Sequence, residues 1–462
     1  MTGGIIALGL ATKELSIRNL KREFISLATE TFKKRREGTL ITMLDPFKLT
    51  STFFLVLHIW GSVYRTRPLR EGLKRLFDPG QNLFSSARRP VRVAVTSVKD
   101  NGADKCLIAN YNRPKFGTDQ DFEREDESEK DMKVWEAALA TAAAPFYFRR
   151  FEKPETKRNY TDGALHANFP VPYALDEIAR VWNRPDDGKI PLDILLSVGT
   201  GIQKKEVSIP VPLKIGGLQA VCTSFHNSLD SHKGWLEFES VRSNESDIQG
   251  RVHRLNFPIE GDYVALDQYK CMEDIDASII AQLKDPTFSS QLQKIANTLI
   301  ANLFFFEPDV NVREIIPAGR SEQLSGTIRC RLARDSNHLK NLVDAVDSFW
   351  YKESRNAEKC TGEKDQWTAI PLSVQQRNGI KTQGRWLRAE CKILPMEALE
   401  AQQILAVTLK CGSENFRQGF PVSPIPISGF PIKFHSLEKK CRQLERRCVY
   451  DLVEADSKDF FR

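Results

Sequence analysis

The sequence predicts an α/β domain over about the first 300 residues, followed by a β-rich domain. In the first part, helical patterns such as the alanine-rich stretch 135–148 alternate with short apolar runs such as 194–201, the pattern of a buried strand that ends in a glycine turn. From about residue 305 the pattern changes, and the stretches 327–332, 386–393 and 404–409 alternate with period two, the period of a strand. A chain of 462 residues is long enough to bury a core in each of two domains.

The composition indicates a globular protein of a reducing compartment. The nine cysteines are scattered and form no C-x-x-C pair, which argues against a disulfide framework and a zinc site. The longest apolar run, 53–60, is too short to span a bilayer, and the start of the chain lacks the basic leader of a secretory signal. We therefore expect a cytoplasmic protein. No phosphate-binding glycine loop or nucleic-acid motif is found, so no cofactor and no nucleic-acid partner are expected.

Positive charge is concentrated at the N-terminal end. The net charge is +7, and residues 1–100 hold 18 Lys and Arg against 8 Asp and Glu. Such a basic face would suit an anionic phospholipid surface. A solvated helix face gives the same pattern, so peripheral membrane association stays open.

The chain opens with two helical patterns. Residues 2–11 are apolar, and their glycines allow close packing against a sheet. Ser16 is placed to cap a second helix. Its apolar residues at helical spacing are Ile17, Leu20, Phe24 and Leu27. The apolar segment 38–63 that follows is interpreted as core, with a lid or an interfacial patch as the alternative.

Two strands and an alanine-rich helix come next. Period-two alternation predicts strands at 91–97 and 106–111. The charged loop 119–131 lacks the spacing of a calcium loop, and we predict no metal site there. The helix within 135–148 should end at Pro145.

Residues 161–164, Thr-Asp-Gly-Ala, carry most of the functional information, because they place one carboxylate between small residues. They occur in a fixed order with residues 2–6, Thr-Gly-Gly-Ile-Ile, with the alanine-rich helix and with residues 195–201. In this order the motifs resemble the patatin-like phospholipase family, and neighbouring stretches resemble its fungal members. The resemblance covers about 300 residues and implies a three-layer α/β/α domain related to the doubly wound folds.

The resemblance implies a serine–aspartate dyad that cleaves lipid or phospholipid esters. In the family, a serine lies on the strand-to-helix turn G-x-S-x-G, and an aspartate in a D-G-A or D-G-G turn is its base. Asp162 matches that aspartate, and Gly163 and Ala164 match the two small residues. A carboxylate acting as a base needs a partly desolvated site. A glycine-rich loop supplies the amides that meet the oxyanion.

The nucleophile position departs from the family pattern. Thr2 and Gly3 match the last two residues of G-x-S-x-G, and Gly4 follows them. Met1 stands where the serine belongs, and no glycine-rich loop precedes it. Because the family motifs before the nucleophile are absent, this chain is expected to be truncated at the nucleophile motif. Because a thioether cannot be deprotonated, it is also expected to be inactive.

The stretch after the aspartate departs as well. His166 stands at a family glycine and Phe169 at a family asparagine. A histidine four residues after Asp162 suggests a triad base, but a lone histidine after a turn is more often a surface residue. We therefore assign it no catalytic role.

Two functions remain open at this point. One is a lipid acyl hydrolase whose N-terminal part is missing from this sequence. The other is a non-catalytic relative that binds lipid or a protein partner. The acyl substrate and the oligomeric state are not predicted.

The predicted domains are therefore a patatin-like domain at 1–303, a β-rich accessory domain at 310–435 and a charged helix at 436–462. In the first, the stretch 272–275 should lead into a helix that ends near Leu303. A sandwich is one arrangement for the second. Membrane targeting, a partner surface and simple packing are equally open roles for the terminal helix.

Overall fold

The computed structural model describes residues 2–13, 15–33, 62–84, 91–99, 104–112, 123–124, 131–145, 147–181, 192–203, 231–242, 251–261, 264, 267–308, 323–333, 336–355, 368–383, 387–392, 401–409, 425–428 and 432–433. They belong to two compact units. The first comprises residues 1–190, 197–246 and 255–280, and the second comprises residues 191–196, 247–254 and 281–462. The predicted bounds 1–303 and 310–435 remain predictions.

The first unit contains a five-stranded sheet with the order β3-β2-β1-β5-β4. Its strands are β1 (Ala94–Lys99), β2 (Asp104–Ala109), β3 (Glu123–Arg124), β4 (Phe151–Lys153) and β5 (Arg158–Asp162). Strands β1 and β2 confirm the predictions at 91–97 and 106–111. Every described pair is antiparallel except β2 with β3. Short connections join β1 to β2 and β4 to β5, and such connections permit only antiparallel neighbours.

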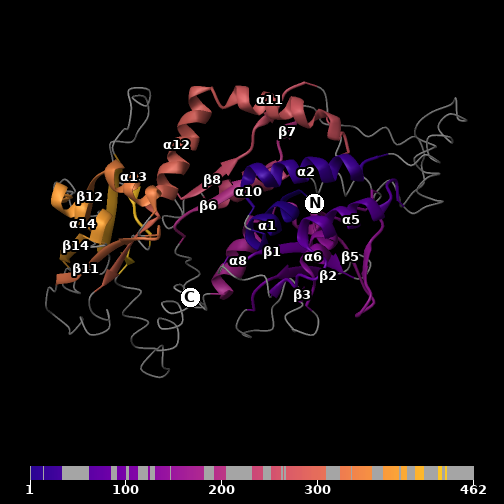
Figure 1. Ribbon diagram of the computed structural model, residues 1–462, viewed down its shortest axis with the longest axis horizontal. Coiled ribbons are helices and arrows are strands. Elements are labelled where there is room, and N and C mark those ends of the chain that lie inside the picture. Colours follow the sequence, from indigo (N-terminus) through magenta and orange to yellow (C-terminus); the bar gives the residue numbers. More distant parts are fainter. Residues whose placement is uncertain are drawn as a thin grey trace, which may run out of the picture. The chain divides into compact units, whose positions relative to one another are not determined.

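Four helices pack around the core of this unit (Figure 1): α1 (Thr2–Thr12), α2 (Ile17–Thr31), α5 (Thr66–Phe77) and α6 (Val134–Ala142). Helix α6 is the most deeply buried of the four, because all its residues except Trp135 are buried in the core. It ends before Pro145, as predicted. The Ser16 cap of α2 is also confirmed, since the Ser16 side chain accepts a hydrogen bond from the Asn19 amide.

The apolar stripe predicted for α2 is only partly right. Leu20 and Leu27 are buried, but Ile17 is 76% exposed. Ile17 is the first helical residue, and the helix begins to pack at Leu20, which lies against the position where a Gly9 side chain would be.

The remaining elements of the first unit follow the sheet. They are α7 (Ala164–Ala167), α8 (Val171–Val181), β7 (Ile202–Gln203), α10 (Ser231–Arg242), β9 (Pro258–Ile259) and the 3-10 helix η4 (Tyr269–Cys271). Strands β7 and β9 pair in parallel. Buried Tyr64 donates a hydrogen bond from its phenol to Asp267, so the last part of the unit is joined to its core.

The strand predicted at 194–201 is β6 (Leu195–Val198), which pairs with β8 (Val252–Leu255). The expectation that β6 is buried is wrong for one face. Val198 is 69% exposed and Leu196 is 37% exposed, and because side chains alternate between the two faces of a strand, both lie on the same, exposed face.

Where one helix ending near Leu303 was predicted after 272–275, the structure has two helices, α11 (Met272–Gln282) and α12 (Pro286–Ala301). The Asp285 side chain accepts a hydrogen bond from the Thr287 amide at 2.8 Å and caps α12. Pro286 occupies the first turn, where its missing N–H costs no hydrogen bond. The cap and the proline therefore start a new helix.

The second unit contains two described sheets. One has the order β10-β11-β14, with β10 (Phe304–Pro308), β11 (Gln323–Cys330) and β14 (Leu387–Lys392). The other joins β12 (Val346–Arg355), β13 (Thr368–Pro371), β15 (Ala401–Leu409), β16 (Ile425–Pro426) and β17 (Ile432–Lys433). Helices α13 (Asn337–Ala345) and α14 (Val374–Gln383), which the sequence patterns missed, also belong to this unit.

The β-rich domain and its sandwich arrangement thus remain predictions. Strands β11, β14 and β15 lie where period-two alternation predicts strands. The predicted terminal helix 436–462 lies outside the described residues, as do most of the apolar segment 38–63 and the charged loop 119–131.

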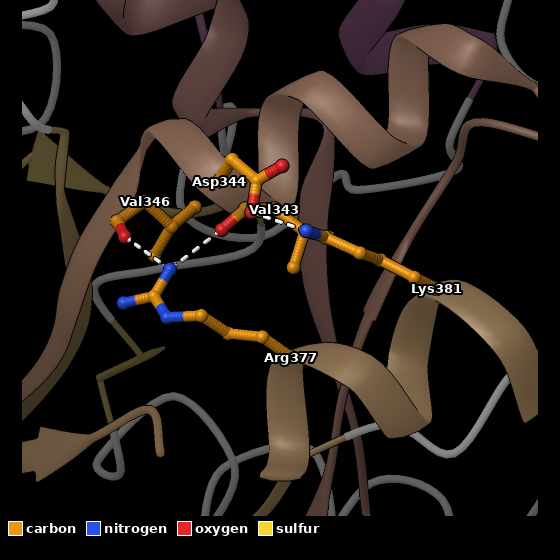
Figure 2. Close-up of polar contacts among 5 residues, drawn as sticks. All are labelled: Val343, Asp344, Val346, Arg377 and Lys381. Atoms are coloured by element: carbon orange, nitrogen blue, oxygen red, sulfur yellow. Dashed lines mark hydrogen bonds and ion pairs between the residues drawn. The ribbon is translucent and has the colours of Figure 1, made fainter. Parts of the chain in front are cut away.

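Arg377 of α14 closes the C-terminal end of α13 (Figure 2). Its guanidinium donates to the backbone oxygens of Val343 at 2.6 Å, Val346 at 2.7 Å and Asp347 at 3.1 Å. Carbonyls at a helix end lack partners within the helix, and a cation there also complements the helix dipole. Lys381, one turn later on α14, pairs with Asp344.

We expect Arg377→Met to destabilise the second unit by about 1.5–3 kcal/mol, the usual worth of hydrogen bonds made by a charged donor. Lys381→Met is the matched control on the same helix. It removes one ion pair whose Asp344 side chain is largely exposed, and should cost less than about 1 kcal/mol. Denaturant-dependent hydrogen exchange of the α13 amides measures both values, and equal losses would contradict the assigned role of Arg377.

Candidate functional site

Asp162 is the last residue of β5 and only 3% of it is exposed. Its Oδ1 accepts a hydrogen bond from the Ala164 amide at 2.9 Å. Its own amide donates to the Ala143 carbonyl at 3.0 Å, just beyond the end of α6. The carboxylate is thus folded over the turn that starts α7, as short acidic side chains commonly are.

Strand β1 holds the other side of this residue. Ser97 is the antiparallel partner of Asp162, and Ser97 is 1% exposed. The Ser97 hydroxyl lies 2.7 Å from the Thr161 carbonyl and 3.3 Å from the Ala140 carbonyl, and can donate to either. This buried serine therefore ties β1 to β5 and α6.

Gly163 is required by close approach rather than by a left-handed conformation. A Cβ at this position would lie 2.4 Å from both the backbone oxygen and the Oγ1 of Thr96. A backbone oxygen cannot turn aside as a flexible side chain can. The Asp-Gly-Ala turn therefore rests directly on β1.

The same threonine connects the turn to α1. Thr141 of α6 donates from its hydroxyl to the Thr96 carbonyl at 2.8 Å. A Cβ on Gly4 would lie 2.5 Å from Thr141 Cγ2. Through Thr141 and Thr96, the first turn of α1 and the Asp162 turn are packed into one region of the unit.

The structure thus brings the Asp162 turn and the start of α1 into one contact network. Thr2 is half-buried, whereas Gly3 is exposed and no atom lies within 4 Å of where its Cβ would be. Met1 lies outside the described residues.

His166 lies on α7 and is exposed. Its backbone amide donates to the Gly163 carbonyl at 3.1 Å, and its carbonyl accepts from the Tyr173 hydroxyl at 3.3 Å. These contacts engage its main chain in the helix that follows the turn.

An aromatic cluster that sequence reasoning missed lies after the turn. The Phe169 ring meets Trp235 and Phe238 of α10, with ring centroids 6.3 Å and 6.1 Å away. Gly234 lets α10 approach, since its Cβ would lie 3.0 Å from the Phe169 ring. The replacement of a family asparagine by Phe169 was the available signal, but its partner helix is too far along the chain to infer.

Acidic groups gather at the other end of α6. Glu136 is 6% exposed, and its carboxylate accepts from the Lys133 amide at 2.9 Å. Asp131 is half-buried, and no hydrogen-bond partner reaches its Oδ1. Burial raises the pKa of both carboxyl groups above their ordinary values. Buried Lys153 donates to the Asp131 carbonyl at 2.8 Å.

This acidic cluster is remote from Asp162. Helix α6 rises about 1.5 Å per residue, so its two ends are separated by roughly 12 Å. Glu136 lies in its first turn, and Ala143, which binds Asp162, lies beyond its last. The cluster therefore bears on stability rather than on chemistry at the turn.

Within the described ranges, no three side chains of the metal-ligating types are grouped so as to hold a metal ion. The helices found in those ranges include none with the length and apolarity needed to cross a bilayer.

The first unit thus combines helices and sheet around a buried aspartate in an Asp-Gly-Ala turn, which Thr96 and Thr141 connect to a glycine-containing first helix. Residues 2–175 match the family described as Patatin-like phospholipase. For the first part of the chain, this match supports a family of lipid acyl hydrolases that has an α/β fold.

Relatives from distant organisms agree with this assignment. The chain is 28% identical to the "cGAMP-activated phospholipase" of Escherichia coli (strain TW11681), over 43% of this chain and 48% of the relative. It is 25% identical to "Phospholipase A I" of Arabidopsis thaliana, over 47% of this chain and 18% of the relative. It is 30% identical to "Patatin-like phospholipase 1" of Plasmodium falciparum, over 37% and 26%. In each case the match spans less than half of the relative's length.

The later part of the chain has a separate match. Residues 323–442 match a domain of unknown function, DUF8392. This match assigns no chemistry to the second unit.

Gly163→Ala should displace the Asp162 turn, because the new methyl group would overlap the Thr96 backbone. We expect a loss of about 1–3 kcal/mol in unfolding free energy, the usual cost of overpacking. Gly3→Ala is the control, since its methyl group meets no atom and alanine favours a helix by up to about 1 kcal/mol. Thermal unfolding of both variants measures the difference, and an undisturbed Gly163→Ala protein would refute the packing described.

Glu136→Gln should make the first unit more stable relative to the parent protein as pH rises. A carboxyl whose pKa is raised on folding stabilises the native state while protonated. That contribution is lost as pH rises from its ordinary value of 4.5 through the raised value. Glutamine keeps an oxygen for the Lys133 amide but does not ionise. Unfolding free energies measured across this pH range should converge at low pH, and a constant difference would contradict the assignment.

Proposed function

We propose that this chain belongs to a lipid acyl hydrolase that cleaves esters of phospholipids or neutral lipids, with Asp162 as its base. One observation supports it most. The contact series Gly4, Thr141, Thr96 and Gly163 packs the first turn of α1 against the Asp162 turn. A nucleophile directly before Thr2 would then stand near a buried carboxylate.

The reaction would follow acyl transfer through serine. The serine oxygen attacks the ester carbonyl carbon while its proton passes to the Asp162 carboxylate. The tetrahedral intermediate collapses to an acyl-serine, and the departing alcohol takes that proton. Water then attacks the acyl-serine with Asp162 again as base, which releases the fatty acid and restores the serine.

Helix α1 is suited to support the negative charge of these steps. It begins at Thr2 and its first turn contains no acidic residue, so the helix's own side chains leave the positive end of its dipole available. In this sequence Met1 holds the nucleophile position. The proposal therefore assigns hydrolysis to a product that has serine there, together with a glycine-rich oxyanion loop.

The second candidate is a non-catalytic relative that binds lipid or a protein partner. Met1 favours it, since a thioether supplies no nucleophile. The exposed apolar residues Ile6 and Leu10 on α1 also favour it, because they offer a face for another molecule.

Likeness to the fungal members, and a cytoplasmic setting, are part of the same proposal. The fungal likeness rests on the sequence around β1 and β2, residues 228–235 and residues 251–256. The cytoplasmic setting is supported by Cys106, Cys271 and Cys330, the cysteines that the structure describes as forming no disulfide bond.

Transcript sequencing upstream of the Met1 codon separates the two candidates. A splice product that places Gly-x-Ser before Thr2, with a glycine-rich loop further upstream, supports the hydrolase. A frame that runs unbroken through the Met1 codon supports the non-catalytic relative, because methionine then stays at the nucleophile position.

Asp162→Asn should lower ester hydrolysis by the serine-containing product at least about a hundredfold, the scale of a lost general base. Asparagine keeps an oxygen for the Ala164 amide, so the turn should persist. Release of fatty acid from phospholipid vesicles and from a soluble short-chain ester measures the loss.

The matched control is Asp176→Asn on α8. Asp176 is exposed and pairs with Arg180, so this change removes a carboxylate without touching the site. Activity should stay within about twofold of the parent product, because exposed pairs contribute little. Full activity of the Asp162→Asn product would remove Asp162 from the mechanism.

A further inference from the structure

A group of exposed arginines lies where two segments of the first unit meet. Arg65 precedes α5 and Arg67 lies in its first turn, while Arg149 and Arg150 follow the end of α6. All four are exposed, and so is Arg70, which lies three residues after Arg67 on the same side of α5. We call these five residues the arginine surface.

Main-chain contacts fix the two segments side by side. The Tyr64 amide donates to the Tyr147 carbonyl at 2.9 Å, and the Arg149 amide donates to Thr66 Oγ1 at 3.1 Å. The Tyr64 and Tyr147 rings stack with centroids 6.3 Å apart. The arginines on either side of these contacts are therefore neighbours in space, held by the buried Tyr64 and by hydrogen bonds of the main chain.

Opposing charge in these segments is sparse. Between residues 65 and 75 the acidic residue is Glu71, and between 147 and 153 it is Glu152. Two further basic residues of α5 have contacts of their own, since Arg75 pairs with Glu30 and Lys74 lies over the Trp135 ring. Along residues 65–75 and 147–153, basic residues therefore outnumber acidic ones.

The arginine surface is connected to the Asp162 turn through a few residues. The Phe148 amide donates to the Ala144 carbonyl at 3.0 Å, so the segment that carries Arg149 folds back onto the end of α6. The neighbouring Ala143 carbonyl accepts from the Asp162 amide. A ligand bound by the arginines would therefore lie close to the elements that hold the aspartate.

We propose that the arginine surface docks this protein on anionic phospholipid membranes. The inference rests on the proposed function, because a lipid acyl hydrolase must meet its substrate at a bilayer surface. Lipid phosphate and carboxylate groups accept hydrogen bonds from guanidinium in a planar, paired geometry, which suits arginine more than lysine. Clustered basic side chains beside a membrane each contribute attraction to its negative surface.

The test uses the full chain with Asp162→Asn, so that vesicles stay intact. The surface variant combines Arg67→Gln, Arg70→Gln and Arg150→Gln. The control variant combines Lys284→Gln, Lys294→Gln and Lys340→Gln, three exposed lysines of the second unit, and removes the same charge. Circular dichroism and thermal unfolding check that both variants fold as the parent protein does.

Binding is measured by co-sedimentation with vesicles of phosphatidylcholine mixed with phosphatidylserine, and with vesicles of phosphatidylcholine alone. We expect the parent protein to bind the mixed vesicles and to be released by added salt, which screens surface charge. The surface variant should bind on the order of a hundredfold more weakly, at the usual worth of three basic residues. The control variant should bind like the parent protein.

Equal binding by the surface and control variants would overturn the proposal, and so would equal binding of the parent protein to both kinds of vesicle. Tighter binding to an acidic peptide or to single-stranded DNA than to the mixed vesicles would assign the surface to another partner and also overturn it. Hydrolysis of a soluble short-chain ester by the serine-containing product reports on the proposed function separately, because that substrate needs no membrane.

Discussion

The Thr96 carbonyl is the point on which the candidate site depends. It accepts the Thr141 hydroxyl at 2.8 Å and lies where any side chain at Gly163 would be. Because a backbone oxygen in a paired strand has little freedom to move, both contacts are fixed by β1. Small residues at positions 4 and 163 are therefore a steric requirement, and the position of the aspartate follows from the sheet rather than from its own loop.

Local sequence patterns predicted the helices and strands that bury one face, and the helix ends that carry a capping residue or a proline. Ser16 and Pro145 set helix ends by capping and by a missing amide, and such effects act within a few residues. Alternation in β1 and β2 was also readable from the sequence. By contrast, β4 is three residues long, and helices α13 and α14 are short in a region of alternating apolar residues. Their structure is set by tertiary packing, which no local window contains.

The site shows the same division. Asp162, Gly163 and Ala164 were found from their spacing and from likeness to a family, but the reason for Gly163 is a contact with a strand over sixty residues earlier. The meeting of Phe169 with Trp235 and Phe238, and of Arg65 with Arg149, depends on equally distant segments. Functional residues could be predicted where they belong to one sequence motif. Contacts between distant segments of the chain could not be predicted.

The hydrogen bond between Tyr64 and Asp267 joins a late segment of the first unit to its core. The Tyr64 ring is 3% exposed among the aromatic residues of the core, and burial together with the Asp267 bond keeps the phenol pKa far above its ordinary value. A fragment cut at residue 175, where the family match ends, would lose Asp267 and with it this hydrogen bond. It would also lose Tyr269 and Met272, which pack against the same core, so residues beyond the stretch matched by the family complete the core of the first unit.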